Sequence, residues 1–159
     1  MYDPNIMNTC IEAAKYSSAH KIGGPFGACI TKDGKIVTTR SNTVLDSGDP
    51  TAHAEMNTIR TASLILHKYD LSDCELYTTG FPCPMCLGAI MWAGIKKVYV
   101  SGLLEDAESI GFKDKFIYNT IDNLNNSCYN MNELDIEFHD RDLAQNLYSA
   151  YKNQKGTIY

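Results

Sequence analysis

49-DPTAHAE-55 and 82-PCPMC-86 are the two most informative segments of this chain. Together they supply three side chains of the kinds that bind zinc and one carboxylate: His53, Cys83, Cys86 and Glu55. A zinc ion with only three protein ligands keeps a fourth position open for water, which separates a catalytic site from a structural one. A carboxylate two residues from a ligand is well placed to move a proton of that water. The two segments therefore predict an open zinc site with a proton-transfer group beside it.

Cys83 and Cys86 lie three residues apart, and Pro84 between them suits the first position of a helix. At this spacing both sulfur atoms face one side of the helix's first turn. The positive N-terminal end of the helix dipole favours the thiolate, which is the form that binds metal. We therefore expect a helix from Pro84 to about Ala93 with both ligands at its start.

His53 and Glu55 pose a geometric question, because two residues apart within a helix they would point to nearly opposite sides. They can serve one metal only if the site lies beyond the start of their helix. The Pro50-Thr51 turn favours that placement, with Thr51 as the N-cap of a helix that runs to about His67. Two helix N-termini are therefore expected to converge on one point, which also suits a hydroxide anion.

Three other interpretations of these residues remain open. A structural zinc would need a fourth ligand, and the remaining histidines all lie far from the cysteines in sequence: His20, His67 and His139. An isolated C-x-x-C pair could be a thiol–disulfide couple, which the His-x-Glu segment and the proline before the first cysteine disfavour. Glu55 could be a surface helix residue, and the zinc would then belong to a non-catalytic interaction module.

Hydrophobic periodicity and turn residues predict an α/β fold, with residues 1–159 as a single domain. Strands are expected at about 26–31, 36–40, 74–79, 97–101 and 134–138. Helices are expected at about 4–19, 51–67, 84–93, 103–109 and 141–153, with loops at 46–50 and 123–132. Helices between strands imply right-handed parallel crossovers, so we predict a three-layer α-β-α sandwich around a five-stranded mixed sheet.

The composition is that of an ordinary soluble globular protein, with a formal net charge of −5 from 19 acidic and 14 basic residues. Nucleic-acid binders usually carry a basic surface, so this balance argues against a nucleic-acid partner. No apolar run approaches membrane-spanning length and no signal peptide is evident, so we expect a cytoplasmic protein without a membrane partner. Four reduced cysteines are expected to act as small buried apolar residues: Cys10, Cys29, Cys74 and Cys128.

The chain resembles the cytidine-deaminase-like superfamily of zinc deaminases over nearly its full length. The resemblance rests on three segments, which are 23-GGPFGA-28, 49-DPTAHAE-55 and 82-PCPMCLGAI-90. Within that superfamily the chain resembles the bacterial guanine deaminases, because of the segment 111-GFKDKFIY-118 and the terminal Tyr159.

The resemblance implies zinc-dependent hydrolytic deamination of a free purine base, namely guanine to xanthine plus ammonia, with one Zn²⁺ per chain. It assigns proton transfer to Glu55 and Asp114, and substrate contacts to Phe26, Asn42, Ala54, Asp114 and Tyr159. It also implies a homodimer in which a C-terminal helix and tail, residues 140–159, close the active site and pack across the subunit interface.

Physical chemistry fits these roles, and each residue also has an alternative interpretation. Phe26 could stack on a base or be a core aromatic residue. Asn42 offers a donor and an acceptor to a purine edge, but asparagine is also common in turns. Asp114 could accept hydrogen bonds from a base or be a solvated charge between two lysines. Tyr159 could close the pocket or be a frayed terminus.

Phe81 is a departure from the family pattern, which usually has Glu immediately before the Pro-Cys pair. The zinc ligands are untouched, so we expect an altered substrate preference or altered hydrogen bonds around the ligands. The segment 119–132 also diverges, and a different lid over the site would follow. Because the zinc motif does not choose a substrate, a tRNA adenosine deaminase and deaminases of a nucleoside, cytosine or a triazine remain alternatives.

Overall fold

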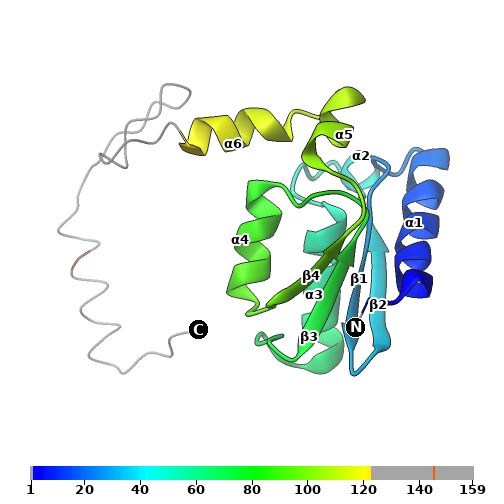
Figure 1. The fold of residues 1–159 in the computed structure, drawn as a ribbon, viewed down its shortest axis with the longest axis vertical. Coiled ribbons are helices and arrows are strands. Elements are labelled where there is room, and N and C mark those ends of the chain that lie inside the picture. Colours follow the sequence, from blue (N-terminus) through cyan, green and yellow to red (C-terminus); the bar gives the residue numbers. More distant parts are fainter. Residues whose placement is uncertain (1, 123–144, 146–159) are drawn as a thin grey trace. The chain divides into compact units, whose positions relative to one another are not determined.

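A computed structural model describes residues 2–122 and Gln145 of the chain (Figure 1). The predicted strand at 134–138, almost all of the predicted helix at 141–153, and both Cys128 and Tyr159 lie outside the described residues. Contacts divide the chain after Tyr118, and all of the proposed site residues except Tyr159 precede that boundary. The prediction of one domain over 1–159 therefore stays a prediction.

A mixed four-stranded sheet, with strand order β2-β1-β3-β4, forms the centre of the described part of the chain (Figure 1). Its strands are β1 Gly27–Lys32, β2 Lys35–Ser41, β3 Cys74–Thr78 and β4 Lys97–Val100. β1 pairs antiparallel with β2 and β3, whereas β3 pairs parallel with β4. Asp33 and Gly34 join β1 to β2, and both have positive φ, as a tight hairpin turn requires. The α/β class and the mixed sheet are confirmed, and the fifth predicted strand is the one outside the described residues.

Six helices occur in the described residues: α1 Pro4–Ala19, α2 Val44–Ser47, α3 Ala54–Leu66, α4 Pro84–Trp92, α5 Leu104–Ser109 and α6 Asp114–Asp122. Asp3 caps α1 by accepting a hydrogen bond from the Asn5 amide at 2.9 Å, as the sequence predicted. α2 replaces the beginning of the predicted 46–50 loop, and α6 was not predicted. α6 combines aromatic and β-branched residues, which have modest helix propensity, so its sequence gives a weak local signal.

The predicted start of the second helix at Thr51 is wrong, because α3 begins at Ala54 with His53 as its N-cap. Asp49 explains the difference. Its Oδ1 accepts hydrogen bonds from the Thr51 amide at 2.8 Å and from the Thr51 hydroxyl at 2.7 Å. Thr51 is therefore held in a turn by the preceding aspartate and does not cap the helix.

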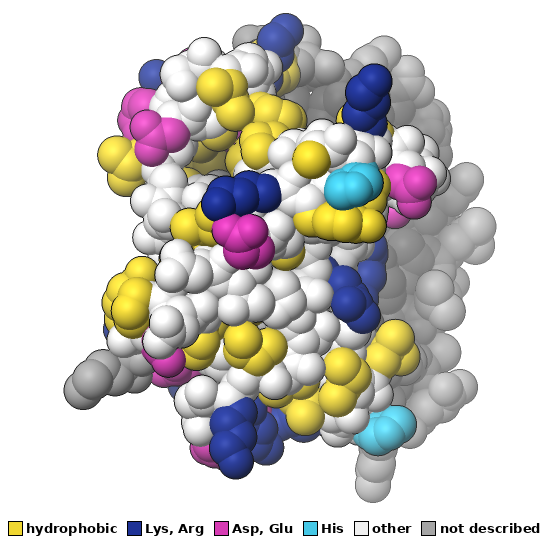
Figure 2. Space-filling view, turned by 90° about the vertical axis from the view of Figure 1, so that its right-hand side faces the viewer, with side chains coloured by type: hydrophobic (Ala, Val, Ile, Leu, Met, Phe, Trp, Pro, Cys, Tyr) yellow, Lys and Arg dark blue, Asp and Glu magenta, His cyan; other side chains and the backbone are white. Residues whose placement is uncertain are grey.

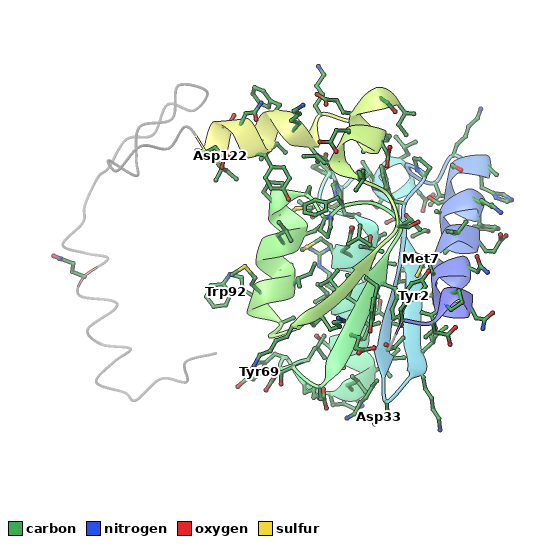
Figure 3. All side chains as sticks on the ribbon, viewed as in Figure 1. Tyr2, Met7, Asp33, Tyr69, Trp92 and Asp122 are labelled. Atoms are coloured by element: carbon green, nitrogen blue, oxygen red, sulfur yellow. The ribbon has the colours of Figure 1, made fainter. Side chains whose placement is uncertain are left out.

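Within the described residues, helices pack against both faces of the sheet (Figure 3). Because side chains alternate along a strand, Cys29 and Tyr77 pack with residues of α1 on one face. Ile30 and Leu76 pack on the other face, against Ala62 of α3 and neighbouring α4 residues. The full three-layer sandwich includes the undescribed final helix and so stays a prediction. Burial is confirmed for three of the four predicted apolar cysteines: Cys10, Cys29 and Cys74.

Charged side chains of both signs are mixed on the face that Figure 2 shows, and its lysines and arginines are spaced apart. None of the helices in the described part of the chain has the length and apolar character needed to cross a membrane.

Candidate functional site

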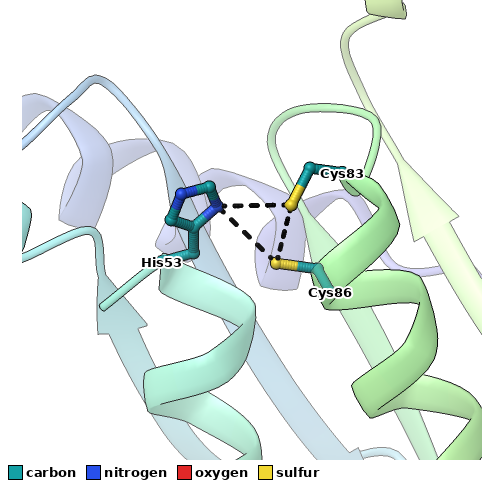
Figure 4. A group of neighbouring side chains, drawn as sticks. All are labelled: His53, Cys83 and Cys86. Carbon is teal, nitrogen blue, oxygen red and sulfur yellow. Dashed lines mark hydrogen bonds between the residues drawn. The ribbon is translucent and has the colours of Figure 1, made fainter. Parts of the chain in front are cut away.

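His53, Cys83 and Cys86 come together between the starts of α3 and α4 (Figure 4). Cys83 Sγ lies 3.6 Å from His53 Nδ1 and 3.6 Å from Cys86 Sγ, and Cys86 Sγ lies 3.7 Å from His53 Nδ1. Tetrahedral zinc with ordinary bond lengths would place two sulfurs about 3.8 Å apart, and a sulfur and a nitrogen about 3.6 Å apart. The spacing of the three donor atoms therefore fits zinc, and so does their chemistry of one imidazole and two thiols.

Two helix N-termini position these ligands, which confirms the geometric prediction made from the sequence. His53 is the N-cap of α3 and has extended backbone angles, so its side chain precedes the helix while Glu55 lies in the first turn. Cys83 is the extended N-cap of α4, Pro84 follows as the first helical residue, and Cys86 lies one turn further on. Because neither N-cap residue makes a capping hydrogen bond with its side chain, the imidazole and the thiol are left for the metal.

The ligands are poised for metal even before it binds. Contact with the Cys86 thiol, followed by the hydrogen bond with His53, lowers the pKa of Cys83 to about 4. The pKa of Cys86 is raised, first by its contact with Cys83 and then by burial. Within the cysteine pair, these shifts favour the thiolate at Cys83 and the protonated thiol at Cys86. Zinc binding has to release the Cys86 proton, so zinc affinity must fall as the pH falls.

Glu55 lies directly beside this cluster and is almost completely buried. Its Oε1 accepts a hydrogen bond from the Thr78 hydroxyl at 2.8 Å, and its Oε2 lies 3.5 Å from Cys86 Sγ. Burial raises the pKa of the Glu55 carboxyl above its ordinary value. A carboxylate whose pKa is shifted toward neutrality both accepts and returns a proton readily, which suits general acid–base catalysis.

A cavity of about 260 Å³ opens onto the cluster. Its polar lining comes from Asn42, His53, Glu55, Cys83 and Asp114, and its wider lining includes Gly23, Gly24, Phe26, Val44, Leu45, Pro50, Phe81 and Phe112. Mostly apolar walls with a few convergent polar groups are typical of small-molecule sites. The volume suits a small molecule.

Asn42 presents its amide to this cavity in one fixed orientation. Its Oδ1 accepts hydrogen bonds from the Gly24 amide at 3.3 Å and from the Val44 amide at 3.1 Å. Gly23 is required beside it, because a β-carbon at that position would collide with Asn42. The interpretation of Asn42 as a turn-forming residue is thus correct for its side-chain oxygen. Its Nδ2 remains as the donor that can serve a molecule in the cavity.

Phe26 and Asp114 also line the cavity, as a substrate role for them requires. The Phe26 ring meets the edge of Phe112, with ring centroids 4.8 Å apart and planes at 80°. Asp114 is half-buried, and burial, followed by the charge of Cys83, raises the pKa of its carboxyl. Ala54 is fully buried and does not line the cavity, and Tyr159 lies outside the described residues.

Sequence reasoning did not identify Phe112, Val44, Leu45 or Pro50 as lining residues. Phe112 lies within the segment 111–118 on which the family resemblance rested, so a signal for it was available. Val44 and Leu45 follow Asn42 in the unpredicted helix α2, where the sequence alone offers no periodic pattern to orient them.

Several known proteins have similar sequences or structures. The bacterial guanine deaminase of Bacillus subtilis (strain 168) is 55% identical over 101 residues, covering 64% of this chain and 65% of that protein. The X-ray structure of guanine deaminase from Bacillus subtilis matches with a TM-score of 0.83 and 40% identity, covering 96% of this chain and 95% of that one. A tRNA-specific adenosine deaminase of Aquifex aeolicus is 46% identical over 79 residues, covering 50% of this chain and 52% of that protein. The sequence matches thus span about two thirds or less of these two curated relatives.

A match to a protein-family model shows the family to which the chain belongs. The cytidine and deoxycytidylate deaminase zinc-binding region matches residues 2–102, which include all three donors of the cluster and Glu55. With its mixed sheet and its His-Cys-Cys cluster at two helix N-termini, this chain belongs to the cytidine and deoxycytidylate deaminase zinc-binding family.

Proposed function

We propose that this protein is a zinc-dependent aminohydrolase that converts the free base guanine to xanthine and ammonia. The observation that carries the proposal is the His53–Cys83–Cys86 triangle with Glu55 beside it, opening onto a cavity of about 260 Å³. The similarity to guanine deaminases in both sequence and structure supports guanine as the substrate.

His53, Cys83 and Cys86 would hold one zinc ion per chain, and zinc when bound supplies a water whose pKa is lowered to about 7. Glu55 accepts a proton from the attacking water and returns it to the leaving amine, so the carboxylate is regenerated in each cycle. Thr78 holds Glu55 for both steps through its hydrogen bond to Oε1. Overall, one water adds to the carbon that carries the amine, and that carbon–nitrogen bond breaks to release ammonia.

The cavity residues hold the base. Phe26 offers an aromatic face for stacking, and its edge contact with Phe112 fixes the ring. Asn42 Nδ2 donates to an acceptor on the purine, because its Oδ1 is already used by backbone amides. Asp114 accepts from N–H groups of the base and takes part in proton relay. Tyr159 completes the proposed contacts, whereas the contact that the family resemblance implies for Ala54 would need a movement of the chain, because Ala54 is fully buried and does not line the cavity.

Replacing Asn42 by Asp tests the proposed donor with little change in shape. The new carboxylate can still accept from Gly24 and Val44, but it offers no N–H to the base. An unpaired buried polar group costs about 1–3 kcal/mol, so kcat/KM for guanine is expected to fall about 10- to 100-fold. Steady-state kinetics with zinc content measured in parallel would detect this loss, mainly as a raised KM. Asn8→Asp on the exposed face of α1 is the matched control, and equal kinetics for both variants would refute the contact.

The substrate itself is tested by measuring ammonia release from guanine, guanosine, adenine, cytosine and a triazine. We expect guanine to be turned over with the highest kcat/KM of the five. Turnover confined to another compound would reassign the substrate within the same chemistry. If a zinc-loaded protein released ammonia from none of them, the free-base proposal would be wrong.

A tRNA adenosine deaminase is the second candidate, because the Aquifex enzyme of that kind is 46% identical over 79 residues. Such an enzyme needs a basic surface for tRNA, whereas this chain has a formal net charge of −5 and spaced basic residues on the face in Figure 2. Tight, salt-sensitive binding of tRNA in a gel-shift assay would favour this candidate over the free base. The homodimer, with its C-terminal segment exchanged or packed across the interface, stays a prediction. Light scattering of the purified protein would test whether the dimer forms.

A further inference from the structure

Tyr118 makes a contact that the proposed chemistry does not yet use. Its hydroxyl donates a hydrogen bond to the backbone carbonyl of Pro82 at 2.6 Å. Pro82 is fully buried and immediately precedes the zinc-ligand residue Cys83. Tyr118 is itself half-buried, and burial raises the pKa of its hydroxyl to about 12. The hydroxyl therefore keeps its proton and remains a hydrogen-bond donor throughout the neutral pH range.

Asp114 lies four residues before Tyr118 on α6, so both side chains project from the same face of this helix. Asp114 lines the cavity, while Tyr118 reaches the loop that leads into α4. The helix segment that carries Asp114 is thus fastened to the backbone that carries the ligand Cys83.

Two aromatic contacts support the same attachment. The Tyr118 ring lies with its centroid 6.3 Å from the centroid of Phe81, which is the residue that departs from the family's usual Glu. Before the helix begins, the ring of Phe112 contacts the ring of Phe26, and both residues line the cavity. Asp114 therefore lies between two anchor points, Phe112 on one side and Tyr118 on the other.

We propose that Tyr118 is a positioning residue, which holds Asp114 toward the cavity by tying α6 to the Pro82 carbonyl. The inference rests on the proposed function, in which Asp114 contacts the purine. Tyr118 does not line the cavity, so its effect on the base must pass through Asp114. Phe81 supports the tyrosine ring through an aromatic contact that a charged glutamate at this position could not make.

Tyr118→Phe is the sharpest test, because it removes the hydroxyl and keeps the ring against Phe81. Hydrogen–deuterium exchange of residues 112–118 is expected to become about tenfold faster, as one net hydrogen bond is lost. Hydrogen–deuterium exchange needs no substrate, so it tests the hydrogen bond between Tyr118 and Pro82 even if guanine is not the substrate. Tyr16→Phe is the matched control, since Tyr16 is exposed on α1, and it should leave exchange in this segment unchanged. Unchanged exchange in Tyr118→Phe would overturn the proposal.

The link to Asp114 is tested by a double-mutant cycle on guanine affinity, measured by calorimetry in the Glu55→Gln background so that the base is not consumed. Tyr118→Phe is expected to weaken guanine binding about tenfold when Asp114 is present. With Asp114→Asn already in place, the same change should have almost no further effect. A full tenfold loss in both backgrounds would show that Tyr118 acts independently of Asp114, and the positioning role would be wrong.

Discussion

Replacement of Glu55 by Gln is expected to reduce kcat for guanine deamination about 10²- to 10⁴-fold, the range that general acid–base catalysis contributes. Glutamine has the same size and keeps an oxygen that can accept the hydrogen bond from the Thr78 hydroxyl. It cannot take a proton from the attacking water or return one to the leaving amine. The loss should therefore appear in kcat, and the variant should bind guanine nearly as well as the wild type. Ammonia release under saturating guanine measures the first effect and calorimetry the second.

Zinc content is the decisive companion measurement for this variant, because Glu55 is beside the donor atoms without being one of the three. We expect Glu55→Gln to retain as much zinc as the wild type. Glu12→Gln, an exposed substitution on α1, serves as the control for removing one negative charge. Wild-type turnover in a zinc-loaded Glu55→Gln protein would refute the catalytic assignment and favour the non-catalytic zinc module.

The cluster of His53, Cys83 and Cys86 was predictable from the sequence because its constraints are local. The spacing of Cys83 and Cys86 fixes both sulfurs on one helical turn. The spacing of His53 and Glu55 is incompatible with a mid-helix site, and this conflict alone predicted that the helix N-terminus faces the metal. The structure moves that N-terminus from Thr51 to Ala54, which makes His53 the cap. The ligand set was unaffected by this error, because it depends on residue type and spacing.

The substrate cavity was less predictable, because it is assembled from segments far apart in the chain. The rings of Phe112 and Phe26 are in contact and both line the cavity, although no sequence pattern relates the two residues. The hydrogen bond from Tyr118 to Pro82 spans 36 residues of sequence, and α6 itself went unpredicted. Asn42 shows a further reason, because its turn role and its proposed binding role use different atoms of one amide. The sequence does not tell which atom of the Asn42 side chain serves each role, whereas the structure does.

Replacement of Cys86 by Ala is expected to lower zinc affinity more than about 100-fold. Removing a residue that only hydrogen-bonds to a metal ligand already lowers affinity by about 10- to 100-fold, and Cys86 is itself a proposed ligand. Cys86 is fully buried, and its Sγ is one corner of the donor triangle at 3.6 Å and 3.7 Å from the other two. Two remaining donors cannot reproduce the three-ligand site on which activation of water depends. Guanine deamination should fall with the zinc content, and metal analysis after dialysis would measure that content directly.

Thermal unfolding separates loss of the metal from general damage to the fold. A ligand that binds only the folded state stabilises it by about 2.7 kcal/mol at a hundredfold excess over Kd, so a chelator should lower the wild-type Tm. Cys74→Ala is the matched control, since Cys74 is also a buried free cysteine but lies in the core cluster away from the donors. It should keep its zinc and its chelator response, although the lost core contact lowers its Tm. Cys86→Ala should show no chelator response, because it has no tightly bound zinc to lose. A chelator shift of wild-type size in Cys86→Ala would mean that Cys86 is not a zinc ligand, and the open-site chemistry proposed for this cavity would then lose its basis.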